Sequence, residues 1–459
     1  MTQTEENVRV LGKKKLEALF DESTFVELGA YTKRSDSESE WESVVCGYGA
    51  IDGRLAFAFL QDSARKKGAF GEKHAKKIAD LYALAVKNGA PVIGVFSSAG
   101  ASVYDGAAAM AAYGRWMKTI ADASGVIPQI AVIDGVCGGS AAVAASMFDF
   151  TVTVKESAAL YVNSPFVIGK EAGTPAFVAA NGTSAYTAES TEDAFAFVRS
   201  LVELLPGNNR AGAWTESGDD LNRVLDFDPN AYSAEELCRE LADGGRFVRL
   251  YGAYTDTTVF GLLPIGGVVT GVIASEPSKK GILNIASARA AAKLISFCDS
   301  FGIPVLTLLD SEGLDVSMEA EGASYASELS RLGMVYATAE NAKITVVIGK
   351  AYGASFGLLG SKALGADIAY ALDGAVISLL SPEASVAFVW NDRVGEESRE
   401  ALEREWVETH ASAEQAAYVG EIDDILEPAE LRKRICAGLM MLAAKAEGTP
   451  SRRHANLPL

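Results

Sequence analysis

The sequence predicts an α/β protein that contains two copies of one fold, and three observations indicate this. Lys-Lys-Gly at 66–68 recurs at 279–281, and the apolar run from 91 recurs from 304, an offset of 213 residues in both cases (279 − 66; 304 − 91). The glycine-rich turn at 138–140 recurs at 353–355. Each copy also alternates short apolar runs with helical segments, which is typical of strands joined by crossover helices on a parallel-type sheet.

The elements of the first copy follow one another as strand, turn and helix. Apolar runs and glycines within 45–62 predict strands and a hairpin. Residues 72–88 have an apolar face at helical spacing and end before Gly89, so they predict an amphipathic helix. The continuous apolar run at 91–96 predicts a buried strand. We further expect a helix at 107–123, a strand at 130–133, a helix that begins at Gly138 and a strand at 150–154.

The second copy repeats this order. The expected strands are 267–274, 304–309, 344–348 and 368–372, and the expected helices are 286–300, 319–338 and 353–364. Between the copies, residues 165–245 differ in composition and include a predicted helix at 194–205. The tail from 396 to 447 reads as helical. We therefore expect two domains, 1–245 and 246–459.

Composition excludes several classes of function. The chain has 459 residues, 49% of them hydrophobic, and a formal net charge of −19, which argues against nucleic acid as a partner. Five cysteines without a Cys-x-x-Cys pair and only three histidines argue against a zinc ribbon, a disulfide framework or a His-rich metal site, so no metal is expected. The sequence shows neither a signal-peptide pattern nor a membrane-spanning apolar run, so we expect a cytoplasmic protein.

The candidate chemistry lies at the two glycine-rich turns. Each turn follows a predicted buried strand and opens a helix, where unpaired backbone N–H groups meet the positive end of the helix dipole. Two such donors can form an oxyanion hole, which stabilises negative charge on a carbonyl oxygen. The candidate residues are Gly138, Gly139 and Ser140 in the first copy and Gly353, Ala354 and Ser355 in the second. The alternative is that small residues here only allow a helix and a strand to pack closely.

Other motifs have a functional and a more ordinary interpretation. Residues 353–357 read Gly-x-Ser-x-Gly, the pattern of a hydrolase nucleophile elbow, but only His410 and His454 lie downstream, so glycines that open a helix are favoured. The two Lys-Lys-Gly turns fit either surface charge or cations near a ligand phosphate.

Four single residues also have a functional and a more ordinary interpretation. His74 is expected on a solvated helix surface, and Cys137 is expected to be a small packing residue because no histidine is near it in sequence. Asp310 and Glu312 fit a turn at the end of a strand better than a catalytic carboxylate pair.

Motifs along most of the chain match a known family in order. They lie at 68–78, 88–94, 124–130, 135–140, 297–299, 343–346, 350–353, 360–362, 364–367, 422–425 and 428–432. On these residues the chain resembles the biotin-dependent acyl-CoA carboxyltransferases. These are the beta-type subunits of propionyl-CoA and acetyl-CoA carboxylases, and the matching subunits of biotin-dependent decarboxylases. The resemblance covers roughly residues 10–445.

The resemblance implies a fold and a site. The fold is a tandem duplication of a crotonase-like (ClpP/crotonase) β-β-α superhelix, with acyl-CoA bound by domain 1–245 and biotin by domain 246–459. Gly138, Gly139 and Ser140 would hold the thioester oxygen, and Gly353, Ala354 and Ser355 the ureido oxygen of biotin. The residues implied to bind the cofactors are Gly68, Gly71, Gly100, Ala101 and Gly313. Members are typically hexamers, so a homo-hexamer is expected, with each active site between the N-domain of one subunit and the C-domain of another.

The resemblance also implies a reaction and partners. Carboxybiotin would release carbon dioxide, the biotin enolate would take the acyl α-proton, and the thioester enolate would attack carbon dioxide without a side-chain base. The substrate would be a short-chain acyl-CoA such as acetyl-, propionyl-, malonyl- or methylmalonyl-CoA. The sequence has no Met-Lys-Met biotinylation motif and no ATP site. Biotin is therefore expected on a separate carboxyl carrier protein, with a biotin carboxylase subunit or a membrane decarboxylase subunit as a further partner.

The chain departs from the family pattern at turns near the substrates. The usual Ser-Gly-Gly-Ala-Arg turn is here 98–102 and ends in Ser102, and Gly357 stands where an acidic residue often occurs. The second Gly-Gly-Ala is Gly-Ala-Ser at 353–355. These changes motivate an alternative hypothesis, a non-catalytic paralogue that serves as a scaffold in a carboxylase or decarboxylase complex.

Overall fold

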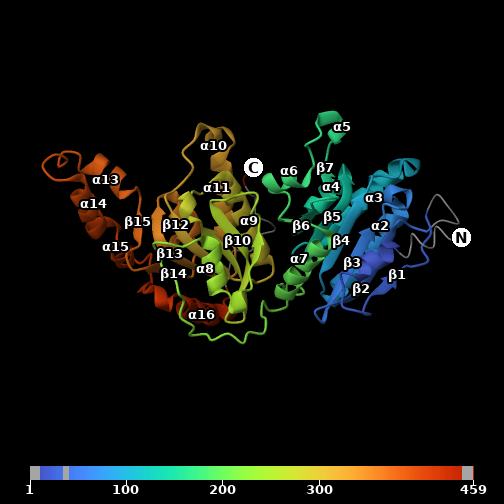
Figure 1. The fold of residues 1–459 in the computed structure, drawn as a ribbon, viewed down its shortest axis with the longest axis horizontal. Helices are drawn as coiled ribbons and strands as arrows, with labels where there is room; N and C mark the ends of the chain where they lie inside the picture. Colours follow the sequence, from blue (N-terminus) through green and yellow to red (C-terminus); the bar gives the residue numbers. More distant parts are fainter. Residues whose placement is uncertain (1–10, 35–40, 447–457, 459) are drawn as a thin grey trace. The chain divides into compact units, whose positions relative to one another are not determined.

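A computed structural model describes residues 11–34, 41–446 and 458 of the chain. The chain divides into two compact units, Met1–Gly212 and Ala213–Leu459 (Figure 1). This division lies earlier than the boundary at 245 expected from the sequence. The reason is that α8 (Ala234–Leu241) packs on strands β10 (Thr258–Ile265) and β11 (Val268–Ser275), and that Trp214 forms a bridge with Val268.

The first unit contains, among its described residues, an eight-stranded sheet in the order β1-β2-β3-β4-β5-β6-β8, with β7 paired to β5. Its strands are β1 (Val26–Leu28), β2 (Val44–Ile51), β3 (Arg54–Gln61), β4 (Val92–Ser98), β5 (Gln129–Gly138), β6 (Phe150–Val154), β7 (Ala159–Tyr161) and β8 (Tyr186–Ala188). The β2–β3 hairpin is antiparallel, and every later pairing is parallel. The hairpin and crossover arrangement predicted from the sequence is confirmed.

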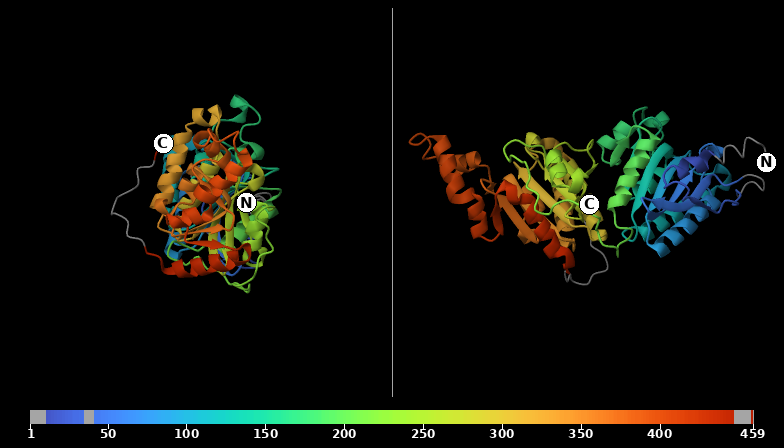
Figure 2. Two further views of the ribbon diagram at one scale, coloured as in Figure 1. Left: turned by 90° about the vertical axis from the view of Figure 1, so that its left-hand side faces the viewer. Right: turned by 60° about the horizontal axis from the view of Figure 1, so that its bottom comes forward.

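Helices cover both faces of this sheet (Figures 1 and 2). They are α2 (Glu72–Asn88), α3 (Ala107–Ala123), α4 (Ser140–Ser146), α5 (Pro165–Ile168), α6 (Pro175–Ala180) and α7 (Thr191–Leu204). Helices α2 and α3 pack against each other and close an apolar core in which Trp116 stacks on Phe70 and Phe96. Helix α7 lies on the opposite face of the sheet and contacts β2, β5 and β6.

The second unit repeats the topology. Its described residues form an eight-stranded sheet in the order β16-β14-β13-β12-β11-β10-β9, with β15 paired to β13. Besides β10 and β11, the strands are β9 (Val248–Leu250), β12 (Val305–Ser311), β13 (Lys343–Tyr352), β14 (Ile368–Leu372), β15 (Val376–Ser378) and β16 (Asp424–Leu426). The helices are α9 (Ile285–Ser300), α10 (Met318–Gly322), α11 (Tyr325–Thr338), α12 (Ala354–Leu359), α13 (Pro382–Val389), α14 (Arg399–Trp406), α15 (Ala413–Tyr418) and α16 (Leu431–Met441). The predicted duplication is confirmed.

Three expectations about elements of the second unit were wrong. The helix expected at 319–338 is two helices, because Ser324 between them has a left-handed backbone conformation with φ of 63°. The helix expected at 353–364 ends at Leu359, and Gly360 follows it. The tail is not wholly helical, because β16 adds to the sheet beside β14 in parallel register.

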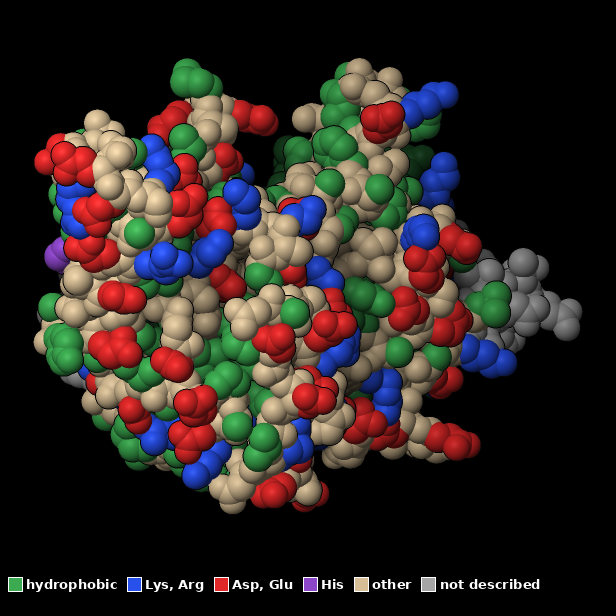
Figure 3. Space-filling model, turned by 60° about the vertical axis from the view of Figure 1, so that its left-hand side comes forward, with side chains coloured by type: hydrophobic (Ala, Val, Ile, Leu, Met, Phe, Trp, Pro, Cys, Tyr) green, Lys and Arg blue, Asp and Glu red, His purple; other side chains and the backbone are tan. Residues whose placement is uncertain are grey.

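The surface agrees with the acidic composition. Figure 3 shows one face, on which carboxylate side chains are scattered among lysines and arginines and hydrophobic side chains are interspersed with both. Within the described part of the chain, no helix is long and apolar enough to cross a membrane.

Candidate active site

The first glycine turn joins β5 to α4 and presents backbone donors. Gly139 has φ of 60° and ψ of −127°, a conformation that glycine adopts without strain. Its N–H donates to the Tyr161 carbonyl oxygen at 2.9 Å, which fixes the turn to β7. Within the described residues, the N–H groups of Ser140 and Ala141 donate to no backbone carbonyl, as expected in the first turn of a helix. Ser140 itself is exposed to solvent.

The second glycine turn joins β13 to α12 in the same way. Gly353 has φ of 58° and ψ of −135°, and its N–H donates to the Ser378 carbonyl oxygen at 2.9 Å. Ala354 is exposed. The Ser355 side chain is buried, and its hydroxyl donates to the Tyr352 carbonyl oxygen at 2.8 Å. Ser355 therefore serves the turn through its backbone, and its hydroxyl is not presented as a nucleophile.

Strand register brings the other predicted residues of the first unit to the same edge of the sheet. Ser98, at the end of β4, pairs with Cys137, directly before the glycine turn. The Ser98 hydroxyl donates to the Gly68 carbonyl at 2.6 Å and accepts from the Gly100 N–H at 3.1 Å. Ala101 forms a parallel bridge with Phe70. Gly68 thus lies on one loop, and Gly100 and Ala101 lie on a second loop that is hydrogen-bonded to the first. This loop pair lies beside the turn at Gly139.

Gly71 closes this loop pair at the first turn of α2, where it is buried and stands at the N-cap. A Cβ atom added there would meet the Asp105 carboxylate at 2.2 Å, so a larger residue would require the Asp105 side chain to move.

The second unit repeats this arrangement around Gly313. Ser311, at the end of β12, pairs with Ala351, and its hydroxyl accepts from the Gly313 N–H at 3.1 Å. A Cβ atom on Gly313 would lie 3.6 Å from the Tyr352 carbonyl, so this residue lies beside the turn at Gly353. The predicted residues therefore form two groups, one in each unit.

Charged groups beside the second turn are paired with one another. Glu312 accepts from Lys350 at 2.7 Å and from Lys280 at 3.2 Å, and these contacts, that with Lys350 foremost, lower the pKa of its carboxyl. The Asp310 carboxylate accepts from the Tyr232 hydroxyl at 3.1 Å and from the Lys350 backbone N–H at 2.9 Å. Both carboxylates are thus held by partners from neighbouring segments, which supports the structural interpretation of Asp310 and Glu312.

Two single-residue predictions have opposite outcomes. Cys137 is buried, and burial raises the pKa of its thiol, so its role as a packing residue is confirmed. His74 was expected to be solvated, and this was wrong. Its side chain is 0% exposed, because the third position of α2 faces the sheet and the ring packs 4.8 Å from Phe70. The lysines around His74 in the sequence suggested a solvated helix surface, but Lys77 on the same helix is also buried.

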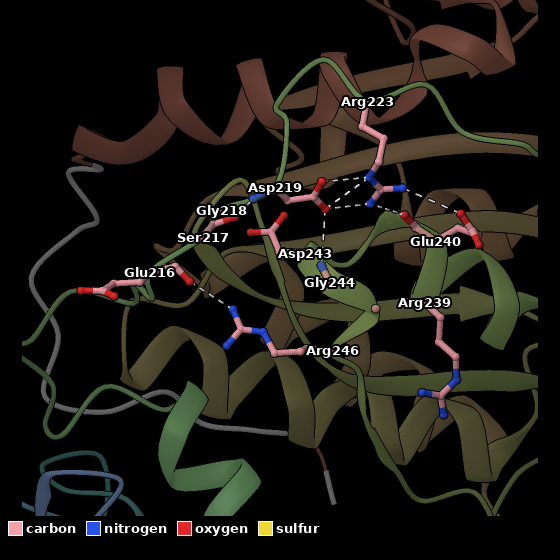
Figure 4. A pocket seen from close by; sticks show the side chains of 11 residues that line it. Glu216, Ser217, Gly218, Asp219, Arg223, Arg239, Glu240, Asp243, Gly244 and Arg246 are labelled. Carbon is pink, nitrogen blue, oxygen red and sulfur yellow. Dashed lines mark hydrogen bonds and ion pairs between the residues drawn. The ribbon is translucent and has the colours of Figure 1, made fainter.

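A pocket of about 640 Å³ in the second unit contains none of the predicted residues (Figure 4). Its lining is Glu216, Ser217, Gly218, Asp219, Arg223, Arg239, Glu240, Asp243, Gly244, Gly245 and Arg246. Arg223 pairs with Asp219 at 3.0 Å, and Arg246 donates to the Glu216 carbonyl at 3.2 Å. The pocket is thus lined mainly by charged residues and glycines of the segment that precedes β9.

Comparisons with known proteins indicate one family for the chain. Residues 9–457 match the family model described as carboxyl transferase domain. The chain is 32% identical to the methylmalonyl-CoA decarboxylase subunit alpha of Veillonella parvula, over 98% of the chain and 93% of that protein. It is 31% identical to the propionyl-CoA carboxylase beta chain of Saccharopolyspora erythraea, over 97% of the chain and 90% of that protein.

The fold is also similar to that of a solved structure. This is transcarboxylase 12S, described as a hexamer assembly with methylmalonyl-coenzyme A and methylmalonic acid bound. The match has a TM-score of 0.91 at 28% identity and covers 98% of this chain and 92% of that one.

The chain belongs to the carboxyl transferase family. The resemblance to biotin-dependent acyl-CoA carboxyltransferases and the tandem crotonase-like fold are therefore confirmed, and so is the prediction that the protein is an enzyme.

Proposed function

We propose that the protein moves a carboxyl group between carboxybiotin and a short-chain acyl-CoA thioester. The observation that carries this proposal is the pair of equivalent turns at Gly139 and Gly353, which share one backbone conformation and each leave N–H donors at the start of a helix. Two oxyanion sites suit a reaction in which two carbonyl oxygens gain negative charge.

The residues have separate roles in this proposal. The turn of Gly138, Gly139 and Ser140 holds the thioester oxygen, and Gly68, Gly71, Gly100 and Ala101 shape the acyl-CoA side. The turn of Gly353, Ala354 and Ser355 holds the ureido oxygen of biotin, with Gly313 beside it. Because the N–H groups of Gly139 and Gly353 donate to the Tyr161 and Ser378 carbonyls, these two glycines set the turn conformation and the residues after them supply the donors. The exposed start of α12 fits this oxygen, because Ala354 adds only a methyl group next to the N–H donors. When bound, carboxybiotin would supply the carbon dioxide and the base for the acyl α-proton, and the backbone donors of the two turns would stabilise the negative charge on the two oxygens.

The substrate is proposed from the relatives. The names of two relatives contain methylmalonyl-CoA and propionyl-CoA, which differ by the transferred carboxyl group. We therefore propose this pair as the first substrates to test. Biotin is proposed to reside on a separate carrier protein, with a biotin carboxylase or a membrane decarboxylase subunit in the same complex.

The assembly is proposed to be a homo-hexamer, the state described for transcarboxylase 12S. Equivalent surfaces of the two units support self-association. Val162 and Leu379, which directly follow the equivalent strands β7 and β15, are 61% and 82% exposed. Phe166 and Val167 on α5 and Phe388 on α13 are also exposed. Exposed apolar side chains in larger patches mark interaction surfaces, and a hexamer interface would cover those of both units.

A carboxyl-exchange assay tests the proposed function. Purified protein is incubated with methylmalonyl-CoA or malonyl-CoA and free biotin, and loss of the acyl-CoA carboxyl group is followed. We expect biotin-dependent loss of substrate. No such loss with any short acyl-CoA, together with no acyl-CoA binding by calorimetry, would favour the scaffold alternative.

A further inference from the structure

A buried polar cluster lies behind the acyl-CoA loops and has no role in the chemistry described so far. It consists of Glu42, Ser43 and His74, all buried. The His74 Nδ1 lies 3.3 Å from the Ser43 hydroxyl and 3.4 Å from Glu42 Oε1. The Ser43 N–H donates to the same Glu42 oxygen at 2.9 Å. Burial opposes ionisation of Glu42, but His74, the Ser43 N–H and Arg34 outweigh it and lower the pKa of the carboxyl.

Hydrogen-bond counting assigns the protons in this cluster. The single Ser43 hydroxyl proton has three candidate acceptors, which are Glu42 Oε1, His74 Nδ1 and the Ala69 carbonyl at 3.3 Å. If Nδ1 carries a proton, it donates to Glu42 or Ser43, and the hydroxyl is then free to donate to Ala69. This arrangement leaves no polar atom of Ser43 unsatisfied. The opposite tautomer places the ring proton on Nε2, which is buried with no hydrogen-bond partner in the described part of the chain, and makes Nδ1 an acceptor that competes with the Ala69 carbonyl for the hydroxyl proton.

Ala69 belongs to the loop pair that carries Gly68 and Gly100. Three backbone hydrogen bonds join this loop to its neighbour: Phe70 N–H to the Gly100 carbonyl at 2.9 Å, Ser102 N–H to the Phe70 carbonyl at 2.7 Å, and Ala99 N–H to the Lys67 carbonyl at 2.8 Å. The Ser43 hydroxyl adds a link from this pair to the residue just before β2. Displacement of Ala69 therefore moves both loops.

The second unit has a serine, Ser287, at the place equivalent to His74, and the carboxylate equivalent to Glu42, Asp256, pairs instead with Lys279 at 2.8 Å. Ser287 is the third residue of α9, as His74 is of α2, and the two are 213 residues apart (287 − 74). Its hydroxyl is buried and bonds to Thr255 at 2.8 Å and to Thr257 at 2.9 Å. The Glu–His pair is thus specific to the unit proposed to bind acyl-CoA.

We propose that His74 is a positioning residue for acyl-CoA, which directs the Ser43 hydroxyl onto the Ala69 carbonyl and so holds loop 66–71 in its binding conformation. The role in acyl-CoA binding rests on the proposed function, whereas the role in loop order does not.

The test compares His74→Leu, His74→Asn and Ser43→Ala in the full-length protein. Asparagine places an amide N–H near the position of Nδ1, and leucine does not. Ser287→Ala is the matched control in the second unit. The first readout is amide hydrogen exchange of residues 66–71. The second is the change in the KM for methylmalonyl-CoA in each variant, compared with the change in the KM for biotin.

We expect His74→Leu and Ser43→Ala to speed exchange of the loop and to raise the KM for acyl-CoA about tenfold, since one hydrogen bond is lost. The KM for biotin and kcat stay near wild type, and His74→Asn restores most of the loss. Unchanged loop exchange in both variants, or equal effects of leucine and asparagine, would overturn the proposal. If wild-type protein binds no acyl-CoA while the loop exchange responds as expected, the proposed function fails and the positioning role stands.

Discussion

Arg432 and Asp243 form a buried ion pair across 189 residues of sequence, with Arg432 Nη2 at 2.5 Å from Asp243 Oδ1. Arg432 is 0% exposed and also donates to the carbonyls of Asp220 and Leu241. Asp243 accepts in turn from the N–H groups of Gly266 and Gly267. Helix α16 is thereby fixed to the segment before β9 and to the β10–β11 turn, which explains why that segment belongs to the second unit.

Replacement of Arg432 by methionine is expected to destabilise the second unit by about 3 kcal/mol, because it leaves the Asp243 carboxylate buried without its cation. For a unit of this size, that loss lowers the melting temperature by roughly 6–12 °C. Differential scanning calorimetry measures it. Lys433→Met on the exposed side of the same helix is the control and should change little. Equal melting temperatures for the two variants would contradict this account.

Gly139→Ala is expected to lower kcat for carboxyl exchange about 10²–10³-fold, the range found when one oxyanion donor is lost. A Cβ atom at Gly139 would meet no neighbour within 4 Å, so the cost comes from the backbone conformation with φ of 60° and not from a clash. Steady-state kinetics measure the effect. Gly114→Ala, in the exposed interior of α3, is the control and should keep full activity. Full activity of Gly139→Ala would exclude this turn from the site.

Gly353→Ala is expected to abolish exchange while acyl-CoA binding stays intact, because the affected turn is the one assigned to biotin. The added methyl group would lie 3.2 Å from the Leu379 carbonyl, and φ is 58°. Calorimetry with methylmalonyl-CoA separates binding from turnover. If this variant loses acyl-CoA affinity and Gly139→Ala does not, the two turns have been assigned to the wrong substrates.

The acid stability of the first unit is expected to depend on Asp134. Burial raises the pKa of this carboxyl, but donors from Lys15, Ser157 and Thr191 outweigh burial and lower it overall. A carboxyl whose folded pKa lies below its unfolded value of about 3.9 stabilises the fold above that pH, and the contribution is lost as pH falls through the folded pKa. Urea unfolding of wild type and Asp134→Asn should therefore differ at pH 7 and converge below about pH 4. A constant difference across this range would contradict the assignment.

The thiols of the native protein are expected to react slowly with Ellman's reagent at pH 8. All five cysteines are free and buried, and burial raises the pKa of the Cys46 thiol to about 12. Because the thiolate is the reactive form, the reaction should follow unfolding. Five thiols should titrate rapidly in guanidinium chloride. A thiol that reacts rapidly in native protein would show a local opening.

The sequence was sufficient for the duplication, for the alternation of buried strands and helices along the chain and for the two glycine turns, because these depend on local pattern and on backbone conformation. It was not sufficient for contacts made over long separations. His74 and Arg432 are polar residues in charged segments, and their burial depends on partners such as Glu42 and Asp243, which lie far from them in sequence. The domain roles, the site residues, the partners and the cytoplasmic location stay predictions.

The duplication has a further consequence for how such a protein can be encoded. Each unit has its own sheet and its own apolar core, and the chain passes from one to the other at Gly212–Ala213. A stop and a new start placed at this junction would therefore leave each half with the residues that fold it. We therefore expect that two genes, one for each unit, can encode the enzyme and that their products complement each other when they are expressed together.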